Sequence, residues 1–337
     1  MKGPVFVTGG SGVIGSALVA RLCKDGDEVV ALARSDAAAA AVAAAGARPV
    51  RGDVLDEPGL ARAMAGARLV FNVAGVNTLC PADRDVLYRT NVGGAAAVVR
   101  AAARAGVGRV VHTSSAAALG EAAGAVGRED SPHRGWFLSD YERSKHDGER
   151  AVLAAARDVG LDAVCVNPSS VQGPGRASGT GRILLGLLDG RLHVFLDTHV
   201  SLVDIADCVE GHLLAATRGR GGERYVLNGV TLTAREALAL VGRVAGVERN
   251  PRMLPPWAAR VAGAVAEGAF RLVRRPPPVC RQMVRTLLFG HRYDGTRATR
   301  ELGLDYTPPE DTLRRTLRWA ASKGLVRNVR VTRSSPG

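Results

Sequence analysis

The sequence predicts a doubly wound α/β fold, with helices on both faces of a parallel sheet and a small C-terminal lobe. Two observations lead to this prediction. The apolar run Pro4–Thr8 is followed by a glycine-rich turn and a helical stretch, Ser16–Leu22. From there to Asn167, apolar runs of strand length alternate with helical segments, and such alternation indicates a parallel sheet with right-handed crossovers.

The turn after the first strand has the glycine spacing of a dinucleotide site. Glycines stand at positions 9, 12 and 15, within the stretch TGGSGVIG. Without Cβ atoms, the backbone lets a pyrophosphate approach the helix N-terminus, where free N–H groups and the helix dipole favour anions. An ordinary turn is the alternative, but the flanking strand and helix favour a Rossmann-type cofactor site. Its predicted contacts are Thr8, Gly9, Ser11, Gly12, Val13, Ile14 and Gly15.

The end of the second strand, Glu28–Leu32, indicates which cofactor binds. An acidic residue usually follows this strand when the cofactor has a free ribose 2′-hydroxyl. The chain has Ala33, Arg34 and Ser35 there, and a guanidinium can hold a 2′-phosphate. The sequence therefore favours NADP(H) over NAD(H), with contacts from Arg34 and Ser35. The alternative is that Arg34 is one more surface arginine.

The ends of the later strands supply the other predicted cofactor contacts. Strands are expected at Arg48–Arg51, Leu69–Val73, Arg109–Thr113 and Asp162–Asn167, and a long helix at Asp85–Arg104. In parallel sheets, ligands bind beyond the carboxyl ends of the strands. The predicted contacts are Asp53, Val54, Val73, Ala74, Gly75, Asn91, Thr113, Asn167, Pro168 and Ser170. For Asp53, a helix N-cap is the alternative.

Tyr141 and Lys145 stand four residues apart in a helix predicted at Asp140–Val159. This spacing puts both side chains on one face, one turn apart. A nearby ammonium favours the phenolate and lowers the pKa of a tyrosine, which is about 10 when unperturbed. The pair therefore predicts a proton donor that works near neutral pH. An ordinary helix, with a packed tyrosine and a solvated lysine, is the alternative.

These motifs occur in the order and spacing of a known family. The chain resembles the extended short-chain dehydrogenase/reductases, which are NAD-dependent epimerase/dehydratase-like proteins. Within them it most resembles the dihydroflavonol reductase and 3β-hydroxysteroid dehydrogenase-like branch. The resemblance covers about Pro4 to Val326. It rests on Thr8–Gly15, Asp53, Asn72–Gly75, Asn91, Thr113–Ser115, Tyr141-x-x-x-Lys145, Asn167–Gly175, Ser201–Asp207, Tyr306–Pro309 and Arg318–Ala320.

The resemblance implies a Ser-Tyr-Lys catalytic triad of Ser115, Tyr141 and Lys145. Tyr141 would pass a proton to or from the substrate oxygen, and Ser115 would hold that oxygen, with Ser114 as the alternative. Lys145 would lower the pKa of Tyr141 and bond the nicotinamide ribose. Asn91 would support the Lys145 side of the site. No metal is needed, because the nicotinamide carries the hydride.

The function expected from these motifs is an NADP(H)-dependent oxidoreductase, a ketoreductase that acts on a moderately apolar ketone or secondary alcohol. One alternative is an NDP-sugar epimerase or dehydratase with tightly bound NAD, and the missing acid after Leu32 counts against it. Another is a non-catalytic dinucleotide-sensing protein, which the Tyr141–Lys145 pair disfavours. The resemblance also implies a homodimer.

Substrate contacts are expected in the segments 76–83, 121–138 and 172–199. The predicted set is Val76, Ser115, Trp136, Gln172 and Leu184. The leucines at 184, 185, 187 and 188 fit a pocket wall or the core of a helix, and the sequence leaves both open. Three arginines of these segments could bind phosphates, although arginine is abundant throughout the chain: Arg176, Arg182 and Arg191.

The chain of 337 residues, 46% of them hydrophobic, is long enough for one large or two small domains. The sequence predicts a dinucleotide-binding domain at 1–167, a mainly substrate-binding lobe at 168–326 and a loose tail at 327–337. The lobe is expected to interleave with the large sheet around 191–216, where Arg191–Ile205 would return to the sheet.

A small molecule is the expected partner, in spite of a net charge of +13. Four of the 45 basic residues are lysines and the rest are arginines spread along the chain, and no nucleic-acid-binding motif is found. The five cysteines are scattered without a CxxC pair, which fits a reducing cytoplasm and gives no metal site. No apolar run reaches 18 residues, and a strand signal begins at Pro4, so neither a transmembrane helix nor a signal peptide is expected.

Leu254–Arg275 has the pattern of an amphipathic helix bounded by prolines. Its large apolar residues, Trp257, Val261, Val265 and Leu272, fall on one stripe. A basic amphipathic helix can lie on an anionic membrane. Packing on the small lobe, as a cover of the substrate pocket, is favoured over this membrane contact.

Overall fold

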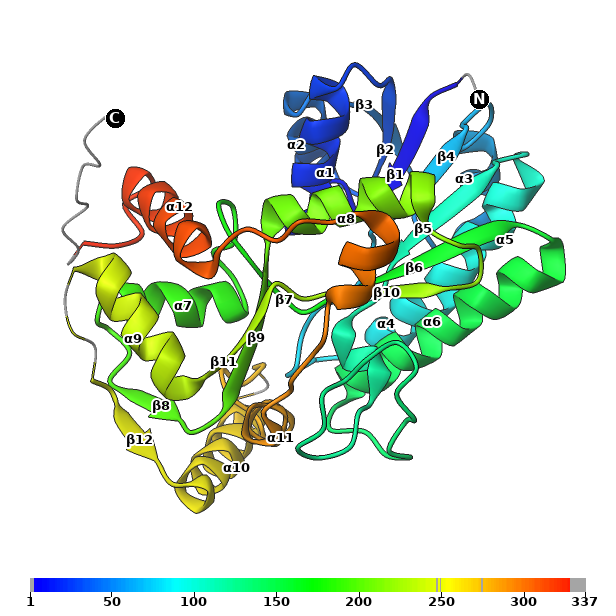
Figure 1. Cartoon of the computed structure of the whole chain (residues 1–337). Helices are drawn as coiled ribbons and strands as arrows, with labels where there is room; N and C mark the ends of the chain where they lie inside the picture. Colours follow the sequence, from blue (N-terminus) through cyan, green and yellow to red (C-terminus); the bar gives the residue numbers. More distant parts are fainter. Residues whose placement is uncertain (1–2, 247, 249, 274, 328–337) are drawn as a thin grey trace, which may run out of the picture.

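Seven parallel strands form the central sheet of the computed structural model, which describes residues 3–246, 248, 250–273 and 275–327. Their order is β3-β2-β1-β4-β5-β6-β10 (Figure 1). The order reverses between β1 and β4, and ligands bind at the carboxyl ends of strands at such a point. The strands are β1 (Val5–Thr8), β2 (Val29–Ala33), β3 (Arg48–Arg51), β4 (Leu69–Asn72), β5 (Arg109–Thr113), β6 (Asp162–Pro168) and β10 (Arg224–Leu227).

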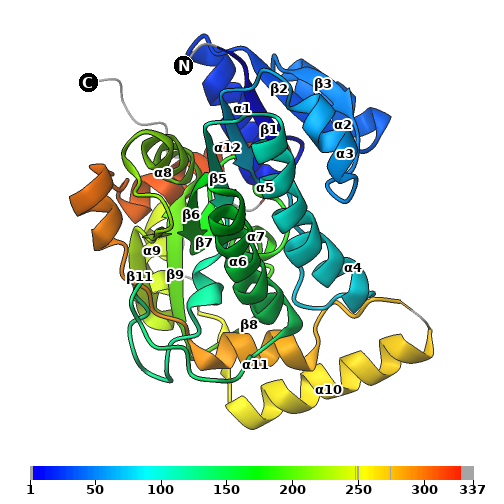
Figure 2. The same ribbon diagram turned by 90° about the vertical axis from the view of Figure 1, so that its right-hand side faces the viewer.

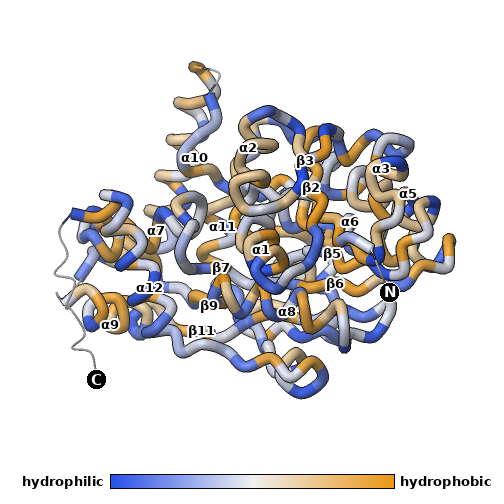
Figure 3. Tube along the Cα trace, turned by 90° about the horizontal axis from the view of Figure 1, so that it is seen from above, coloured by the Kyte–Doolittle hydropathy of each residue, from blue (hydrophilic) through white to orange (hydrophobic). Residues whose placement is uncertain are grey.

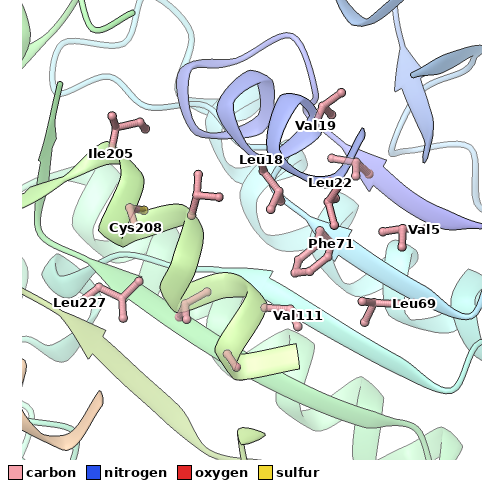
Figure 4. Close-up of a cluster of buried hydrophobic side chains, with 14 of the residues drawn as sticks. Val5, Leu18, Val19, Leu22, Leu69, Phe71, Val111, Ile205, Cys208 and Leu227 are labelled. Carbon is pink, nitrogen blue, oxygen red and sulfur yellow. The ribbon is translucent and has the colours of Figure 1, made fainter. Parts of the chain in front are cut away.

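Helices cover both faces of this sheet, which confirms the predicted doubly wound fold. One face carries α1 (Val13–Lys24), α2 (Asp36–Ala44) and α8 (Ile205–Arg218), and the other carries α3 (Glu57–Ala63), α5 (Ala95–Arg104) and α6 (Asp140–Val159). Each set closes over its own hydrophobic cluster. Figure 4 shows Leu18 of α1, Cys208 of α8 and Phe71 of β4 meeting in one of these clusters.

A small lobe adjoins the carboxyl end of the large sheet. It holds a three-stranded sheet of β11 (Val230–Thr233), β9 (His199–Asp204) and β7 (Ser170–Gln172), and a pair of β12 (Arg252–Leu254) with β8 (Val194–Leu196). Its helices α7 (Thr180–Leu188), α9 (Ala234–Ala245) and α12 (Pro309–Ser322) share a separate core. The predicted tail falls largely outside the described residues, because these end at residue 327.

The two lobes interleave, and α8 does so within the predicted range 191–216. The expectation that Arg191–Ile205 rejoins the large sheet is wrong, because β8 and β9 lie in the small sheets. The chain returns instead through α8, which packs on the large sheet, and through β10, which pairs with β6. The sequence does not specify which strand such a segment will pair with.

The long helix expected at Asp85–Arg104 is divided into three parts. α4 (Arg84–Tyr88) leads into a π-helical segment, η1 (Arg89–Gly94), and then into α5. A π-helical turn inside an α-helix often marks a functional site. Here it carries Asn91, one of the predicted site residues.

Two further helices, α10 (Pro256–Leu272) and α11 (Arg281–Phe289), lie side by side at the edge of the molecule (Figure 2). The N-cap of α11, Cys280, forms a disulfide with Cys80 in the loop after β4. The sequence argument for a reducing compartment rested on the scattered positions of the cysteines. It loses its basis, because the fold joins two cysteines that are 200 positions apart. Short helical turns complete the described chain: η2 (Ala116–Leu119) and η3 (Ala298–Leu302).

Two kinds of feature are absent from the described residues. None of their helices has the length and the apolar content needed to cross a bilayer. None of their histidines, cysteines or carboxylates gather in threes as metal ligands would.

Opening the Cys80–Cys280 bond should lower the free energy of unfolding by about 2–4 kcal/mol, because the cross-link restricts the unfolded chain. Denaturant melts of the oxidised protein, the reduced protein and Cys280→Ala would measure the loss. Cys23→Ala, which removes a half-buried free thiol, is the matched control and should change stability less. Thiol titration of the oxidised, denatured chain should find the three free cysteines, and a count of five would contradict the bond.

Candidate active site

Polar side chains join the ends of β1 and β4 at the point where the strand order reverses. Thr8, which is fully buried, donates from Oγ1 to Asn72 Oδ1 over 2.8 Å. The same oxygen accepts from the Ala74 N–H over 3.1 Å. The predicted residues Thr8, Val73 and Ala74 therefore lie together at this point.

The glycine turn approaches the segment after β4 too closely for any side chain. At Gly9, whose φ is 69°, a Cβ atom would lie 2.7 Å from the Ala74 backbone nitrogen. At Gly15, a Cβ atom would lie 2.1 Å from the Gly9 carbonyl oxygen. The first turn of α1 has no acidic residue, and its N-cap, Gly12, makes no side-chain hydrogen bond. The first N–H groups of α1 are left for an anion, so the turn fits the pyrophosphate of a dinucleotide.

Arg34 is exposed just beyond the end of β2, where the sequence predicts the contact with a 2′-phosphate. Ser35 instead caps α2 through its side-chain oxygen. A second arginine, Arg51, lies beside this position, since β3 pairs it with Ala33 of β2. Arg51 also forms an exposed ion pair with Asp36 at 3.4 Å. The sequence reasoning missed Arg51, although its place at a strand end gave the signal.

The remaining predicted contacts of the adenine half lie near the same strand ends. Asp53 Oδ1 accepts from the Leu55 N–H over 3.0 Å, so it shapes the turn after β3. The helix-cap alternative for Asp53 is wrong, because Asp56 caps α3. Val54 is buried. Three residues of the glycine turn complete the set: exposed Ser11 and half-buried Val13 and Ile14.

α6 begins at Asp140 and ends at Val159, as predicted, with Ser139 as its N-cap. This start places Tyr141 in the first turn, where its phenol lies close enough to the Ser115 side chain for that group to lower its pKa. Ser115 directly precedes η2 and its Oγ accepts from the N–H of Ala117 over 3.3 Å. Ser114, the alternative, points elsewhere: its Oγ is buried without a hydrogen-bond partner among the described residues.

Lys145 is buried one turn further along α6. Its Nζ donates to the Thr113 carbonyl oxygen over 2.9 Å, which ties α6 to the end of β5. A Cβ atom at Gly75 would lie 3.5 Å from this Nζ, so the lysine also adjoins the segment after β4. Burial lowers the pKa of Lys145 to about 8, and the negative charge of Glu149 opposes the shift.

The prediction that Lys145 lowers the pKa of Tyr141 is wrong for the free protein. Burial raises this pKa, and the groups that oppose the rise are Ser115, through its nearby hydroxyl, and Arg176, through its charge. Lys145 has no part in the shift because its ammonium is turned to Thr113. Sequence reasoning named Arg176 as a phosphate ligand and missed its proximity to the tyrosine.

Arg176 is a half-buried cation in the loop after β7. Its Nε is buried without a hydrogen-bond partner among the described residues. Burial lowers the pKa of the guanidinium, and the charge of Tyr141 opposes this. A cation so placed can take up negative charge that develops near the phenol.

Asn91 positions both sides of the site from η1. Its Oδ1 accepts from the Val76 N–H over 2.7 Å, and its Nδ2 donates to the Val76 carbonyl over 3.0 Å. Nδ2 also donates to Ser144 Oγ over 3.0 Å. Asn91 therefore fixes the backbone after Gly75 and the residue beside Lys145, and the predicted substrate residue Val76 is held through its backbone.

Three predicted residues, one near the end of β6 and two in β7, have structural partners. Asn167 donates from Nδ2 to the Ser115 carbonyl over 3.1 Å and to Glu149 Oε2 over 2.5 Å. Ser170 and Gln172 bond each other and Thr180, and Gln172 Oε1 is buried without a partner in the described chain. Pro168, also predicted, is the last residue of β6.

The other two predicted substrate residues, Trp136 and Leu184, pack against neighbouring side chains. Trp136 is half exposed and meets Phe289 of α11 edge-on, with ring centroids 6.3 Å apart. Leu184 packs against the small-lobe core, together with Leu185 and Leu188, so the helix-core alternative for the leucine run holds for these residues.

A buried histidine, His212, forms a hydrogen bond with the side chain of Thr113. Thr113 Oγ1 donates to His212 Nε2 over 2.8 Å, while His212 Nδ1–H donates to the Cys208 carbonyl over 2.6 Å. Sequence reasoning did not find this contact, because the two residues are 99 positions apart. It fixes the strand end that receives Lys145.

Known proteins resemble this chain in sequence and in fold. A model of the NAD dependent epimerase/dehydratase family matches residues 5–228. The chain belongs to this family. The match confirms the predicted resemblance to the extended short-chain dehydrogenase/reductases.

Individual proteins of known sequence or structure match nearly the whole of this chain. A Synechocystis protein provisionally named a dihydroflavonol 4-reductase is 32% identical over 96% of each chain. A protein of Stigmatella aurantiaca named as a ketoreductase of a farnesyl dihydroquinoline oxide is 32% identical over 88% of this chain and 90% of its own. The crystal structure of gox2253 has a TM-score of 0.84 at 29% identity, and covers 97% of this chain and 100% of its own.

Between about pH 4 and 6.5, the free energy of unfolding should rise with pH through the two buried histidines behind the site. Burial lowers the pKa of His212 from 6.5 to about 4 and that of His112 well below its usual range. The unfolded chain binds more protons in this window, so stability increases as pH rises through it.

Denaturant melts across this window would measure the rise, which should be smaller in His212→Gln. His193→Gln, at an exposed position, is the control and should keep the wild-type slope. An unchanged slope in His212→Gln would contradict the assignment.

Proposed function

We propose that this protein is an NADP(H)-dependent oxidoreductase that transfers hydride between the nicotinamide and a ketone or secondary alcohol of a moderately apolar small molecule. The observation that carries the proposal is the placement of Tyr141 next to Ser115, one helical turn from a Lys145 that is fixed to the end of β5. These groups lie at the carboxyl ends of the strands, as does a helix N-terminus that fits a pyrophosphate.

The nicotinamide supplies or receives the hydride. In reduction, Tyr141 gives its proton to the substrate oxygen while the carbonyl carbon becomes the carbinol carbon, and Ser115 donates a second hydrogen bond to the same oxygen. The raised pKa of Tyr141 keeps the phenol protonated at neutral pH, which suits a proton donor. Arg176 stabilises the phenolate that this transfer leaves, because its charge favours the ionised form.

The names of the relatives support the substrate class. Both are named for reductases, and the ketoreductase is named for a substrate that carries a farnesyl chain. We propose a carbonyl compound with an apolar body for this protein too. The exposed Arg34, with no acid at the end of β2, supports NADP(H) over the tightly bound NAD of an epimerase.

Location and assembly belong to the same proposal. We propose the cytoplasm, where nicotinamide cofactors are supplied; the Cys80–Cys280 bond counts against this placement, because disulfides are rare in reducing compartments. The proposed assembly is a homodimer through the helices around α5 and α6, as the family resemblance implies.

Replacing Tyr141 by Phe should lower NADPH-dependent turnover about 10²–10⁴-fold, because the proton donor is lost. Absorbance at 340 nm would follow NADPH oxidation with a panel of ketones, flavanonols and steroids. Binding of NADPH, measured by fluorescence, should stay close to wild type. Phe fills the same space as Tyr, so the variant tests the hydroxyl rather than the packing.

The outcomes separate this function from its alternatives. Bound NAD with no net redox change would indicate an epimerase or dehydratase. Cofactor binding without turnover, and without an effect of the Tyr141 variant, would indicate a dinucleotide-sensing protein.

Replacing Arg34 by Ala should weaken NADPH binding about tenfold and leave NADH binding nearly unchanged, because the lost charge-assisted bond goes to the 2′-phosphate. Titrations of both cofactors by fluorescence would measure the ratio of the two dissociation constants. Arg157→Ala, at an exposed position near the end of α6, is the matched control. Equal losses for NADPH and NADH would refute the assignment of Arg34.

A further inference from the structure

Small residues lie where α10 packs against α11. Ala259 is buried, and a Cβ atom at Gly263 would lie 2.8 Å from the Val284 side chain of α11. α10 thus has its protein partner on this face. This packing is on a helix within the predicted C-terminal lobe, but it does not use the large apolar residues of α10.

The outer face of α10 carries the large apolar residues instead. We call them the α10 stripe: Trp257, Val261, Val265 and Leu272, whose exposed fractions are 68%, 54%, 65% and 88%. Their spacing puts them within about a quarter of the helix circumference. A helix at a protein surface normally buries such a stripe. A contiguous exposed apolar stripe is therefore a mark of an interaction site.

α10 stands clear of the rest of the molecule. In Figure 2 it extends along the lower edge, with α11 on one side and no other element beyond it. Figure 3, seen from a perpendicular direction, shows the same helix projecting outward from the body. The stripe can therefore meet an extended flat surface without a clash from neighbouring elements.

Positive charge surrounds the stripe. The sequence from residue 251 to 285 contains seven arginines and one acidic residue, Glu267. Among those described, Arg252, Arg260, Arg275 and Arg281 are exposed. The Glu267 carboxylate accepts a hydrogen bond from the Arg281 backbone N–H over 3.0 Å, so this acidic group is engaged within the protein.

We propose that the α10 stripe docks this protein on the surface of a bilayer that contains anionic phospholipids. The apolar side chains enter the boundary between headgroups and acyl chains, and the arginines meet the lipid phosphates. Trp257 suits this boundary, because indole combines an apolar body with an N–H donor. The helix lies in the plane of the surface.

Charge favours a bilayer over a second copy of the chain. In a symmetric dimer through α10, each stripe would face the other, and the arginines of both copies would meet. Like charges brought together in this way oppose association. Phospholipid phosphates supply the opposite charge over a wide area, which a second copy does not.

The docked helix is tied to the candidate active site. Gln282 of α11 accepts from the Asp140 N–H over 2.9 Å and donates to Asp140 Oδ2 over 2.7 Å. Asp140 is the residue before Tyr141, so docking would bring that end of the site near the bilayer. This consequence, delivery of an apolar substrate from the lipid phase, rests on the proposed function, whereas the docking itself does not.

Vesicle sedimentation with the full-length protein tests the docking. Protein should pellet with vesicles of phosphatidylcholine mixed with phosphatidylglycerol, and at least tenfold less with phosphatidylcholine alone. Added salt should release it. Combined Trp257→Ser and Val261→Ser, and separately Arg260→Gln with Arg275→Gln, should each weaken binding about tenfold.

Two matched controls and a solution measurement make the test decisive. Val126→Ser with Val159→Ser removes two exposed valines elsewhere, and Arg62→Gln with Arg157→Gln removes two exposed charges elsewhere. Both should bind vesicles as the wild type does. Absence of vesicle binding overturns the proposal, as does a stripe variant that changes only the oligomeric state in gel filtration.

Failure of the docking can be told from failure of the proposed function. Turnover of a water-soluble ketone by the stripe variant should equal that of the wild type, because the stripe lies outside the catalytic groups. Loss of vesicle binding with normal turnover in this assay supports the docking role. Vesicle binding without any turnover leaves the docking in place and removes the proposed function.

Discussion

The hydrogen bond from Lys145 Nζ to the Thr113 carbonyl sets the geometry of the whole site. It fixes how α6 sits over the end of β5. Because α6 is rigid, the residue one turn earlier, Tyr141, then falls beside Ser115, which follows Thr113 by two positions. Burial of the ammonium is unfavourable, as the lowered pKa of about 8 shows, and the charge of Glu149 offsets part of that cost.

Glu149 depends in turn on the last strand of the large sheet. It accepts from Asn167 of β6 and from Arg224 of β10, at 2.5 and 3.0 Å. Between β6 and β10 the chain runs through β7, α7, β8, β9 and α8. The partners of Glu149 therefore come together only when the chain has passed through part of the small lobe and returned to the large sheet.

Sequence reasoning succeeded where the signal was local. The glycine turn and the helix bounds of α6 follow from short-range patterns, and so does the shared face of Tyr141 and Lys145. It failed where a partner lies far along the chain. The acceptor of Lys145 is 32 residues away, and the partner of Cys80 is 200 residues away. Helical spacing gives the face of a side chain but not the atom that it meets.

The sequence pattern of α10 did not show which of its faces meets the protein, and the reason is a different one. A hydrophobic stripe specifies a buried face only when the helix has one apolar side, but α10 has two. Small residues such as Ala259 and Gly263 give the closer approach, so α11 packs on them and the stripe is left outside. Side-chain volume, rather than hydrophobicity, decides which face of such a helix meets its protein neighbour.

α10, α11 and the start of α6 form one connected unit in this protein. α11 is bonded to α6 through Gln282 and Asp140, and to the loop after β4 through Cys280 and Cys80. That loop begins beside Gly75, which adjoins Lys145. The start of α6 and the loop after β4, which flank the candidate site, are therefore attached to α11. The stripe is on α10, which packs against α11. On the proposed bilayer, one surface would position the protein and also orient the proton donor toward the phase in which an apolar ketone is dissolved.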